Sequence, residues 1–288
     1  MFRLESVTKT FTALAALSLV ERKALDLDAP VKDLVPSVSF SDSELGQQVT
    51  LRRLLTHTAG LSRNQILKLR DVRAGNEYEV LFSKNPLTLG ALDRFEYSNT
   101  GYLLVGAAIE RAAKTSFADA SRALVTKPLG LVNATSDSAL AATHEHADGF
   151  GLDEQGRERS FDPQSLDPYV QRPVGGLHAS IEELTLFASR FVAGVPEVLK
   201  RATFDEMTKK HVATDERDVW YGYGIYGLDS PRGPVWTHTG AGRGSTAYFL
   251  CAPRDRFAFV AITNAGRYTG WRDVRRAAEE AFLGAALF

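Results

Sequence analysis

The sequence has only one cysteine, Cys251, so no disulfide can form within the chain. This fits a reducing compartment, although exported enzymes without disulfides are also common. No apolar run reaches the roughly 20 residues that a transmembrane helix needs. For the chain as it stands, we therefore expect no membrane span and a cytoplasmic location.

The chain also lacks an excess of charge of either sign. It has 34 Lys and Arg against 35 Asp and Glu, and no basic run. This composition argues against a nucleic-acid partner and against an anionic membrane surface. Repeats and low-complexity segments are absent too. Hydrophobic residues make up 44% of the 288, enough to bury a large core in one domain or two lobes.

The commonest motif around a serine nucleophile, Gly-x-Ser-x-Gly, is also missing, so an α/β-hydrolase site is not expected. The chain has Ser6-Val7-Thr8-Lys9 instead. Positions three apart share one face of a helix, so the Lys9 amine can reach the Ser6 hydroxyl. A buried lysine can lose its proton near neutral pH and act as a base. The alternative is a helix cap followed by a solvated lysine.

Residues 10–20 are apolar or small on every face, which predicts a helix buried all round. The same stretch could pass for a short signal peptide. Glu5 and the charged run of residues 21–23 argue against that interpretation, because a small-residue cleavage site is not present.

Two kinds of periodicity divide the chain. Helical spacing predicts helices over residues 51–55, 101–113, 117–124 and 181–192. A period of two predicts strands over residues 220–228, 235–239, 245–251 and 257–263, and a closing helix over 271–287. Its spacing places Val274, Ala277, Ala278, Ala281 and Phe282 on one face of that helix. The organisation is a mainly helical lobe, about 6–192, followed by an antiparallel sheet and a terminal helix, about 218–288.

The strand at 257–262 is apolar on both faces, which is typical of a central strand with neighbours on both sides. The sequence has too few strands to supply both neighbours.

Two further motifs could meet Ser6 in one cleft. Tyr97-Ser98-Asn99 precedes a predicted helix, and there Tyr97 could relay a proton while Asn99 bonds a lysine or a substrate carbonyl. The alternative is that Asn99 caps that helix. His238-Thr239-Gly240-Ala241 ends a predicted strand, and backbone N–H groups there, with that of Ser6, could bind an oxyanion. The alternative is a plain Gly-rich hairpin.

Ser-x-x-Lys, Tyr-x-Asn and His-Thr-Gly in this order resemble the serine β-lactamase and penicillin-binding protein superfamily. The set is similar to the branch that holds class C β-lactamases, D-alanyl-D-alanine carboxypeptidases and β-lactamase-like esterases. The likeness covers nearly the whole chain, and the segments that carry it are residues 2–31, 54–61, 128–131, 175–177 and 263–264. It implies an α/β (α+β) fold of the β-lactamase/transpeptidase type, with an antiparallel sheet flanked by helices.

The resemblance also implies roles. Ser6 would be acylated, Lys9 and Tyr97 would share the general-base work, and Tyr97 would return the proton. Asn99 would orient Lys9 and the substrate, and His238 would support Tyr97. Thr239, Gly240 and Ala241 would bind the substrate, with the Ala241 N–H in the oxyanion hole. No metal or organic cofactor is implied, and the partner is a small ester, amide or peptide-like substrate. The oligomeric state stays open.

Two departures shift the expected chemistry. His238 replaces a lysine, so a fixed positive charge for a substrate carboxylate is missing, and Ala241 carries no hydroxyl for a peptide terminus. Arg243 could substitute. We therefore expect a serine hydrolase acting on a small ester or amide; the alternative is a β-lactamase or D,D-carboxypeptidase.

A third departure concerns the start of the chain. Only five residues precede Ser6, whereas the family has strands there that pair with the last strand of the sheet. We interpret this as N-terminal strands that are missing. The alternative from another functional class is thus a catalytically silent, truncated member that acts as a binding protein.

Other candidates are weaker. His144 and His146 could bind zinc only with further ligands. His57 is expected to be structural, and His178 could line the cleft. Cys251 is expected to be a buried apolar residue. The tyrosines 221, 223 and 226 could form either an aromatic substrate wall or sheet packing.

Overall fold

The computed structural model describes residues 1–65, 77–153, 155–161, 169–231, 233–266 and 271–283. Its longer helices are α1 (Thr8–Glu21), α6 (Asn99–Ala113), α10 (Ile181–Val192) and α12 (Trp271–Leu283). The shorter ones are α2 (Val31–Leu34), α3 (Ser43–Gly46), α4 (Leu51–Leu55), α5 (Glu77–Ser83), α7 (Phe117–Ser121), α8 (Ser138–Ala141), α9 (Arg172–Gly175) and α11 (Arg201–Met207). Single turns of other helix types are η1 (Glu5–Val7), η2 (Arg122–Thr126), η4 (Tyr169–Gln171) and η5 (Pro253–Asp255).

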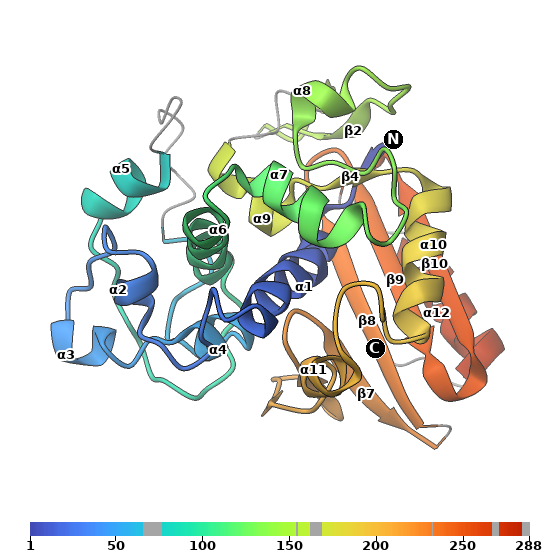
Figure 1. Ribbon diagram of the computed structural model, residues 1–288. Helices are drawn as coiled ribbons and strands as arrows, with labels where there is room; N and C mark the ends of the chain where they lie inside the picture. Colours follow the sequence, from blue (N-terminus) through green and yellow to red (C-terminus); the bar gives the residue numbers. More distant parts are fainter. Residues whose placement is uncertain (66–76, 154, 162–168, 232, 267–270, 284–288) are drawn as a thin grey trace.

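The main sheet is antiparallel and has the strand order β10-β9-β8-β7-β6-β5. Its strands are β5 (Val212–Ala213), β6 (Val219–Tyr221), β7 (Tyr226–Ser230), β8 (Gly233–Ala241), β9 (Thr246–Ala252) and β10 (Phe257–Thr263). Two small antiparallel pairs join β1 (Phe2–Arg3) to β4 (His178–Ala179) and β2 (Gly149–Leu152) to β3 (Glu158–Phe161). Figure 1 shows α2 to α6 grouped on one side of α1 and the sheet on the other.

Helix α1 occupies the middle of the molecule, where it contacts α6 and α9. Residues 8–19 are all buried, as the absence of a polar face predicts. The turn η1, which leads into α1, packs against β8 and β9. The N-terminal helix therefore carries Ser6 to the boundary between the helices and the sheet.

Strand β9 presents alternate side chains to the two faces of the sheet. Phe249 faces α10, where its ring lies 5.4 Å from the Phe187 ring. Tyr248 and Leu250 belong to a second apolar cluster on the other face. There the Tyr248 hydroxyl donates to Glu279 of α12 at 3.0 Å. Helices thus flank both faces of the antiparallel sheet, as the sequence predicts.

The predicted helices at 51–55 and 181–192 match α4 and α10 at both ends. Helix α6 contains the predicted helix at 101–113, and α7 followed by η2 spans the one at 117–124. The predicted strand at 220–228 is wrong in one respect. It is two strands, β6 and β7, because residues 222–225 form a turn in which Gly224 has a φ of +68°. Glycine adopts this conformation without steric cost.

The apolar face of the last helix is largely exposed at its described positions. Val274 is 51% exposed, and Ala277 and Ala281 are exposed, whereas Glu279 is 1% exposed. Glu279 contacts the Tyr248 hydroxyl and lies 3.2 Å from the Arg275 Nε, so its carboxylate is paired on the buried side of the helix. Phe282 lies outside the side chains that the structure describes.

Strand β10 pairs with β9 alone among the described residues, so it occupies an end of the sheet. One side of β10 therefore has no strand partner within those residues, as the shortage of strands in the sequence predicts. Its residues are half-buried along its whole length, because α10 packs against it. Alternate residues pack on the two faces: Ala258, Val260 and Ile262 against the main core, and Phe257 and Phe259 against the second apolar cluster. Both faces of the strand therefore contact apolar residues.

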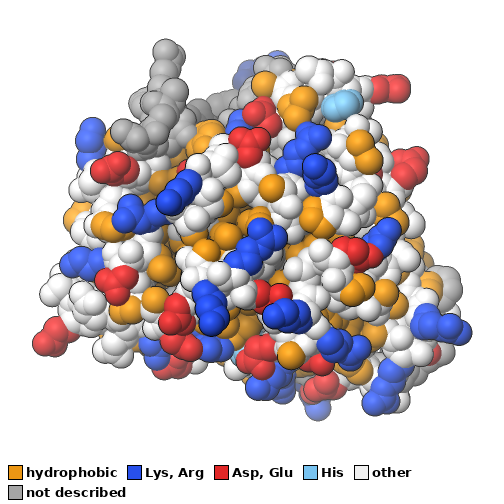
Figure 2. Space-filling view, viewed as in Figure 1, with side chains coloured by type: hydrophobic (Ala, Val, Ile, Leu, Met, Phe, Trp, Pro, Cys, Tyr) orange, Lys and Arg blue, Asp and Glu red, His pale blue; other side chains and the backbone are white. Residues whose placement is uncertain are grey.

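Within the described part of the chain, no helix is long and apolar enough to cross a bilayer. On the face shown in Figure 2, acidic and basic side chains alternate without a large field of one sign. That face matches the balanced charge of the sequence.

Candidate active site

Ser6 lies in the turn η1, directly before α1, and Lys9 is in the first turn of that helix. The Lys9 Nζ donates to the Ser6 Oγ at 3.1 Å and to the Val174 carbonyl oxygen of α9 at 2.9 Å. The predicted contact between the two side chains is therefore present. Two partners hold the amine beside the hydroxyl.

Lys9 is completely buried. Burial lowers its pKa well below the ordinary value of lysine, and the positive charge of Arg63 lowers it further, while Glu5 acts in the opposite direction. Desolvation disfavours the ammonium form, so the neutral amine that a general base requires becomes accessible.

Tyr97 approaches the same hydroxyl from the loop before α6. Burial raises its pKa to about 12, and its hydrogen bond with Ser6 acts against that rise. The phenol therefore keeps its proton at neutral pH. The Lys9 Nζ lies 5.0 Å from the Tyr97 ring centroid, and the His57 ring packs against the same tyrosine at 4.3 Å.

His57 has a structural role in this loop, as expected. Its Nδ1 accepts a hydrogen bond from the Ser98 N–H at 3.0 Å, which fixes the backbone next to Tyr97. Burial lowers the pKa of His57 well below its ordinary value, so the ring is neutral and can accept. The Ser98 hydroxyl, in turn, accepts from the Gly101 N–H at 3.0 Å. Ser98, not Asn99, is thus the cap of α6.

Asn99 does not hydrogen-bond Lys9 among the described contacts, contrary to the expected role. Its Nδ2 donates to the Asn64 Oδ1 at 2.8 Å, and its own Oδ1 is buried without a partner within the described residues. Its role in substrate binding stays a prediction.

His238 lies on β8 and is buried. Its Nδ1 lies 2.8 Å from the Thr239 carbonyl oxygen, which can only accept, so Nδ1 carries the proton. The Nε2 then accepts from the Tyr221 hydroxyl at 3.2 Å. The described partner of His238 is therefore Tyr221 and not Tyr97. Burial lowers the pKa of His238 to about 3, so the ring is neutral.

Gly240 lets β8 approach the backbone at Ser6 closely. A Cβ at this position would lie 2.1 Å from the Leu4 carbonyl oxygen and 2.9 Å from the Ser6 nitrogen. Only glycine permits that approach. The backbone of the third motif therefore lies beside the backbone of Ser6, which is the arrangement that an oxyanion hole needs.

Glu5, the residue directly before Ser6, contacts the turn that follows β8. Its Oε1 accepts from the Ser245 hydroxyl at 3.2 Å and lies 3.4 Å from the Arg3 Nε. Its φ is +49°, a left-handed conformation that is costly for a side chain with a Cβ. These contacts hold the strained residue in place. The sequence offers no indication of this role.

A cavity of about 290 Å³ opens above Ser6. The residues that line it are Ser6, Arg63, Phe95, Tyr97, Thr214, Asp215, Glu216, Tyr226, His238, Thr239 and Ala241. All three sequence motifs contribute to this wall. Gly240 lies behind it, and Asn99 is not part of the lining.

A sequence model of the Beta-lactamase family matches residues 1–283. The chain belongs to the beta-lactamase family. Its relatives support a serine hydrolase at the level of the family.

Three relatives of this beta-lactamase family member are informative. Penicillin-binding protein 4 of Amycolatopsis lactamdurans is 27% identical over 94% of this chain and 74% of its own length. Esterase EstB of Burkholderia gladioli is 35% identical over 46% of this chain, which is 37% of the esterase. The structure of a D-stereospecific amidohydrolase from Streptomyces sp. superimposes with a TM-score of 0.79 at 23% identity, over 99% of this chain and 87% of that one.

The cavity of this beta-lactamase family member is also lined by side chains that lie outside the three sequence motifs. Arg63 and Phe95 come from loops of the helical part, and Asp215 and Glu216 come from the turn between β5 and β6. Their spacing in the sequence carries no signal, because only the tertiary fold brings these loops together.

Other candidates lie outside the lining. His178 pairs β4 with β1, its pKa is lowered to about 3 by burial, and its Nδ1 lies 3.0 Å from the Gly176 carbonyl oxygen. Arg243 is exposed and does not line the cavity. Of the three tyrosines in β6, β7 and their turn, only Tyr226 reaches it. Cys251 is buried in β9, as expected, and burial raises the pKa of its thiol.

No three potential metal ligands among His, Cys, Asp and Glu gather in the described residues. His146 lies 3.8 Å from Asp148, and no third ligand joins them in that part of the structure.

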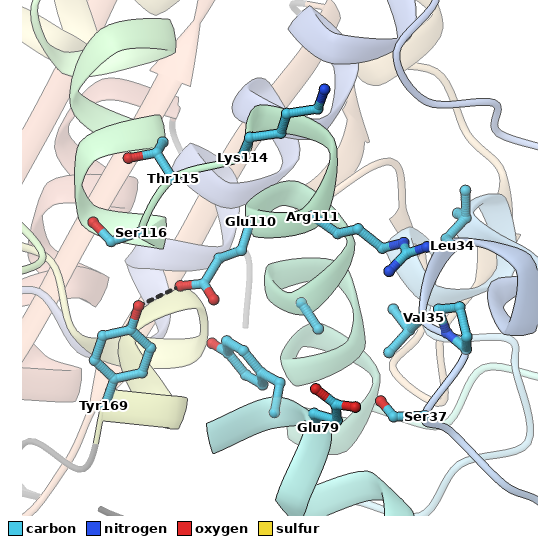
Figure 3. Close-up of a pocket in the computed structure, with 13 residues that line it drawn as sticks. Leu34, Val35, Ser37, Glu79, Glu110, Arg111, Lys114, Thr115, Ser116 and Tyr169 are labelled. Carbon is cyan, nitrogen blue, oxygen red and sulfur yellow. Dashed lines mark hydrogen bonds between the residues drawn. The ribbon is translucent and has the colours of Figure 1, made fainter. Parts of the chain in front are cut away.

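A larger cavity of about 730 Å³ lies at the far end of α6 (Figure 3). Glu110 points into it and accepts from the Tyr169 hydroxyl and the Phe117 N–H, both at 2.6 Å. Burial raises the pKa of Glu110. The Ser6–Lys9 pair lies in the smaller cavity, so chemistry and not size identifies the candidate active site.

Proposed function

We propose that this protein is a serine hydrolase that cleaves small esters or amides through an acyl-enzyme on Ser6. The observation that carries the proposal is the 3.1 Å contact between the Ser6 Oγ and the Nζ of a fully buried lysine. A neutral amine at this distance can accept the hydroxyl proton as the oxygen attacks a carbonyl carbon.

The proposed steps use the side chains of Ser6, Lys9 and Tyr97 and the backbone N–H groups of Ser6 and Ala241. Lys9 accepts the Ser6 proton while Oγ bonds to the substrate carbonyl carbon. The carbonyl oxygen becomes negative and is bound by the N–H groups of Ser6 and Ala241. As the bond to the leaving group breaks, Tyr97 donates its proton to that group, and the Lys9 ammonium returns a proton to Tyr97. Water then attacks the acyl carbon, and the same groups move protons in reverse.

The preference for esters and amides is supported by His238. At the position of the third motif, a neutral imidazole provides no fixed positive charge for the carboxylate of a β-lactam. The Burkholderia relative is an esterase and the Streptomyces structure is an amidohydrolase. The cavity of about 290 Å³ also suits a small substrate.

Intact-mass spectrometry after incubation with a fluorophosphonate, and separately with a penicillin, tests the proposal. We expect one fluorophosphonate adduct on the wild type and none on Ser6→Ala. Lys9→Met should slow labelling by about 100-fold or more, because general-base catalysis contributes this much. Ser62→Ala, an exposed hydroxyl outside the cavity lining, is the matched control and should be labelled like the wild type.

The penicillin arm separates the alternatives. A stable or slowly hydrolysed penicillin adduct on Ser6, formed faster than the fluorophosphonate adduct, would favour β-lactam or D,D-peptide substrates. Absence of both adducts on a folded sample would contradict the enzyme and favour a catalytically silent binding protein.

A further inference from the structure

Arg63 lies at the entrance to the candidate active site, where its guanidinium carbon is 4.9 Å from the centroid of the Tyr97 ring. The side chain is exposed and lines the same cavity as Ser6. The backbone beneath it is fixed, because the Arg63 carbonyl oxygen accepts from the Asn99 N–H at 2.9 Å. This hydrogen bond anchors the loop to the start of α6, so the cation has a defined place beside the nucleophile.

The charge of Arg63 is not neutralised by any carboxylate at ion-pair distance among the described residues. Two arginines of the nearby helix α4 differ in this respect: Arg52 pairs with Asp28 at 2.7 Å and Arg53 with Asp93 at 2.9 Å. Stacking on Tyr97 holds the guanidinium and leaves its N–H edge available. A planar guanidinium with free N–H groups matches a carboxylate in a two-point contact.

The electrostatic effect of Arg63 reaches the reacting groups. Its positive charge lowers the pKa of Lys9 and also that of Tyr97, although burial dominates both. A charge felt at both side chains lies close to the place where a scissile carbonyl would bind. Neither His238, which is neutral, nor Arg243, which is outside the lining, offers a competing cation in this cavity.

Part of the lining, the acidic wall, has the other sign. Asp215 and Glu216 line the cavity in the turn before β6, and Glu216 raises the pKa of Tyr226, which Arg63 lowers. A substrate anion would be repelled by these two carboxylates and attracted to Arg63.

We propose that Arg63 is a specificity-determining residue that selects small esters or amides carrying a carboxylate close to the scissile carbonyl. This inference rests on the proposed function, because it assumes that Ser6 is the nucleophile. The substrate class is a half-ester or half-amide of a short dicarboxylic acid, or an acyl group of equivalent charge.

Three 4-nitrophenyl esters with five-carbon acyl chains test the inference: the neutral pentanoate, the anionic hemiglutarate and the cationic 5-aminopentanoate. Rates are corrected with Ser6→Ala as the blank. We expect the wild type to prefer the anionic ester. In Arg63→Gln, the ratio of kcat/KM for the anionic ester to that for the neutral ester should fall about ten-fold or more. Arg63→Lys should retain part of the ratio, and 0.5 M salt should reduce it in the wild type.

Arg94→Gln is the matched control, because Arg94 is exposed, lies outside the cavity lining and changes the net charge equally. Its ratio should equal that of the wild type. Fluorophosphonate labelling of each variant separates the two proposals: failure to label the wild type overturns the proposed function itself. Normal labelling with an unchanged ester ratio in Arg63→Gln overturns only the role of Arg63. A preference for the cationic ester that disappears in Glu216→Gln would also overturn it and assign selection to the acidic wall.

Discussion

Burial acts on Lys9 and Tyr97 in opposite directions on the pKa scale. It lowers the pKa of the amine and raises that of the phenol, because in both cases it disfavours the charged form. Burial therefore favours the neutral forms of both side chains beside Ser6.

Glu5 raises the pKa of Lys9 and so shifts the pH below which activity is expected to be lost. Its carboxylate favours the ammonium form of Lys9 and so raises the lysine pKa against the larger effect of burial. If Lys9 is the base, activity is lost as pH falls through that pKa. In Glu5→Gln the pKa drops further, so the acid limb of the profile of kcat/KM against pH should move to lower pH.

The pH profile of Arg63→Gln should move the opposite way, because loss of a positive charge raises the Lys9 pKa. Glu44→Gln, an exposed acid on α3, serves as the control with an unchanged limb. Identical acid limbs in the wild type and Glu5→Gln would mean that Lys9 does not set this limb.

At the residue scale, spacing alone predicts the contact between Ser6 and Lys9, since an interval of three fixes a shared helical face. The partners of Asn99 and His238 are not predictable this way. Asn64 and Tyr221 reach them from loops and strands far away in the sequence. Arg63 was missed for the same reason.

Among the elements, the helices with a regular amphipathic or a fully apolar sequence are predicted best. Helix α10 has the bounds that its periodicity gives, and a capping box at Ser180 and Glu183 marks its start. The sequence is less informative where a carboxylate is paired on the buried side of a helix, as for Glu279 in α12. It is also less informative where glycine divides an aromatic run, as between β6 and β7.

Helix α1 ends in a motif that its sequence does not favour. The Lys23 N–H donates to the Val20 carbonyl and the Ala24 N–H to the Leu19 carbonyl, both at 2.9 Å, with Lys23 at a φ of +58°. This Schellman arrangement normally has glycine at the left-handed position. Lys23→Gly should therefore raise the free energy of unfolding by about 1 kcal/mol.

Urea denaturation monitored by circular dichroism measures this difference, with Lys23→Ala as the control. Alanine keeps the Cβ and the strain, so it should stay within about 0.5 kcal/mol of the wild type. Equal gains from glycine and alanine would show that the side chain, and not the backbone conformation, sets the stability of this helix end.

For the whole molecule, one aromatic cluster ties the N-terminal helix to the sheet. The Phe187 ring of α10 lies 4.2 Å from the Phe11 ring of α1 and 5.4 Å from the Phe249 ring of β9. Phe187 is fully buried, so Phe187→Ala leaves a cavity at the junction of three elements. It should lower the free energy of unfolding by about 3–5 kcal/mol.

The neighbouring Leu186 is 36% exposed, and Leu186→Ala should cost much less. Thermal or urea unfolding of both variants compares the two positions directly. Similar losses at the two positions would contradict the view that this cluster joins the helices to the sheet.

The position of Ser6 near the start of α1 has a consequence for biosynthesis. Ser6 and Lys9 leave the ribosome before Gly240 and Ala241, which complete the surroundings of Ser6 and are translated more than 200 residues later. At synthesis rates of about 5–20 residues per second, this is a delay of roughly 10–50 s. During that time the growing chain holds a serine and a lysine without their burial or the backbone of β8. An acylating probe added to nascent chains of increasing length would thus record the moment at which the last strands close over the first helix.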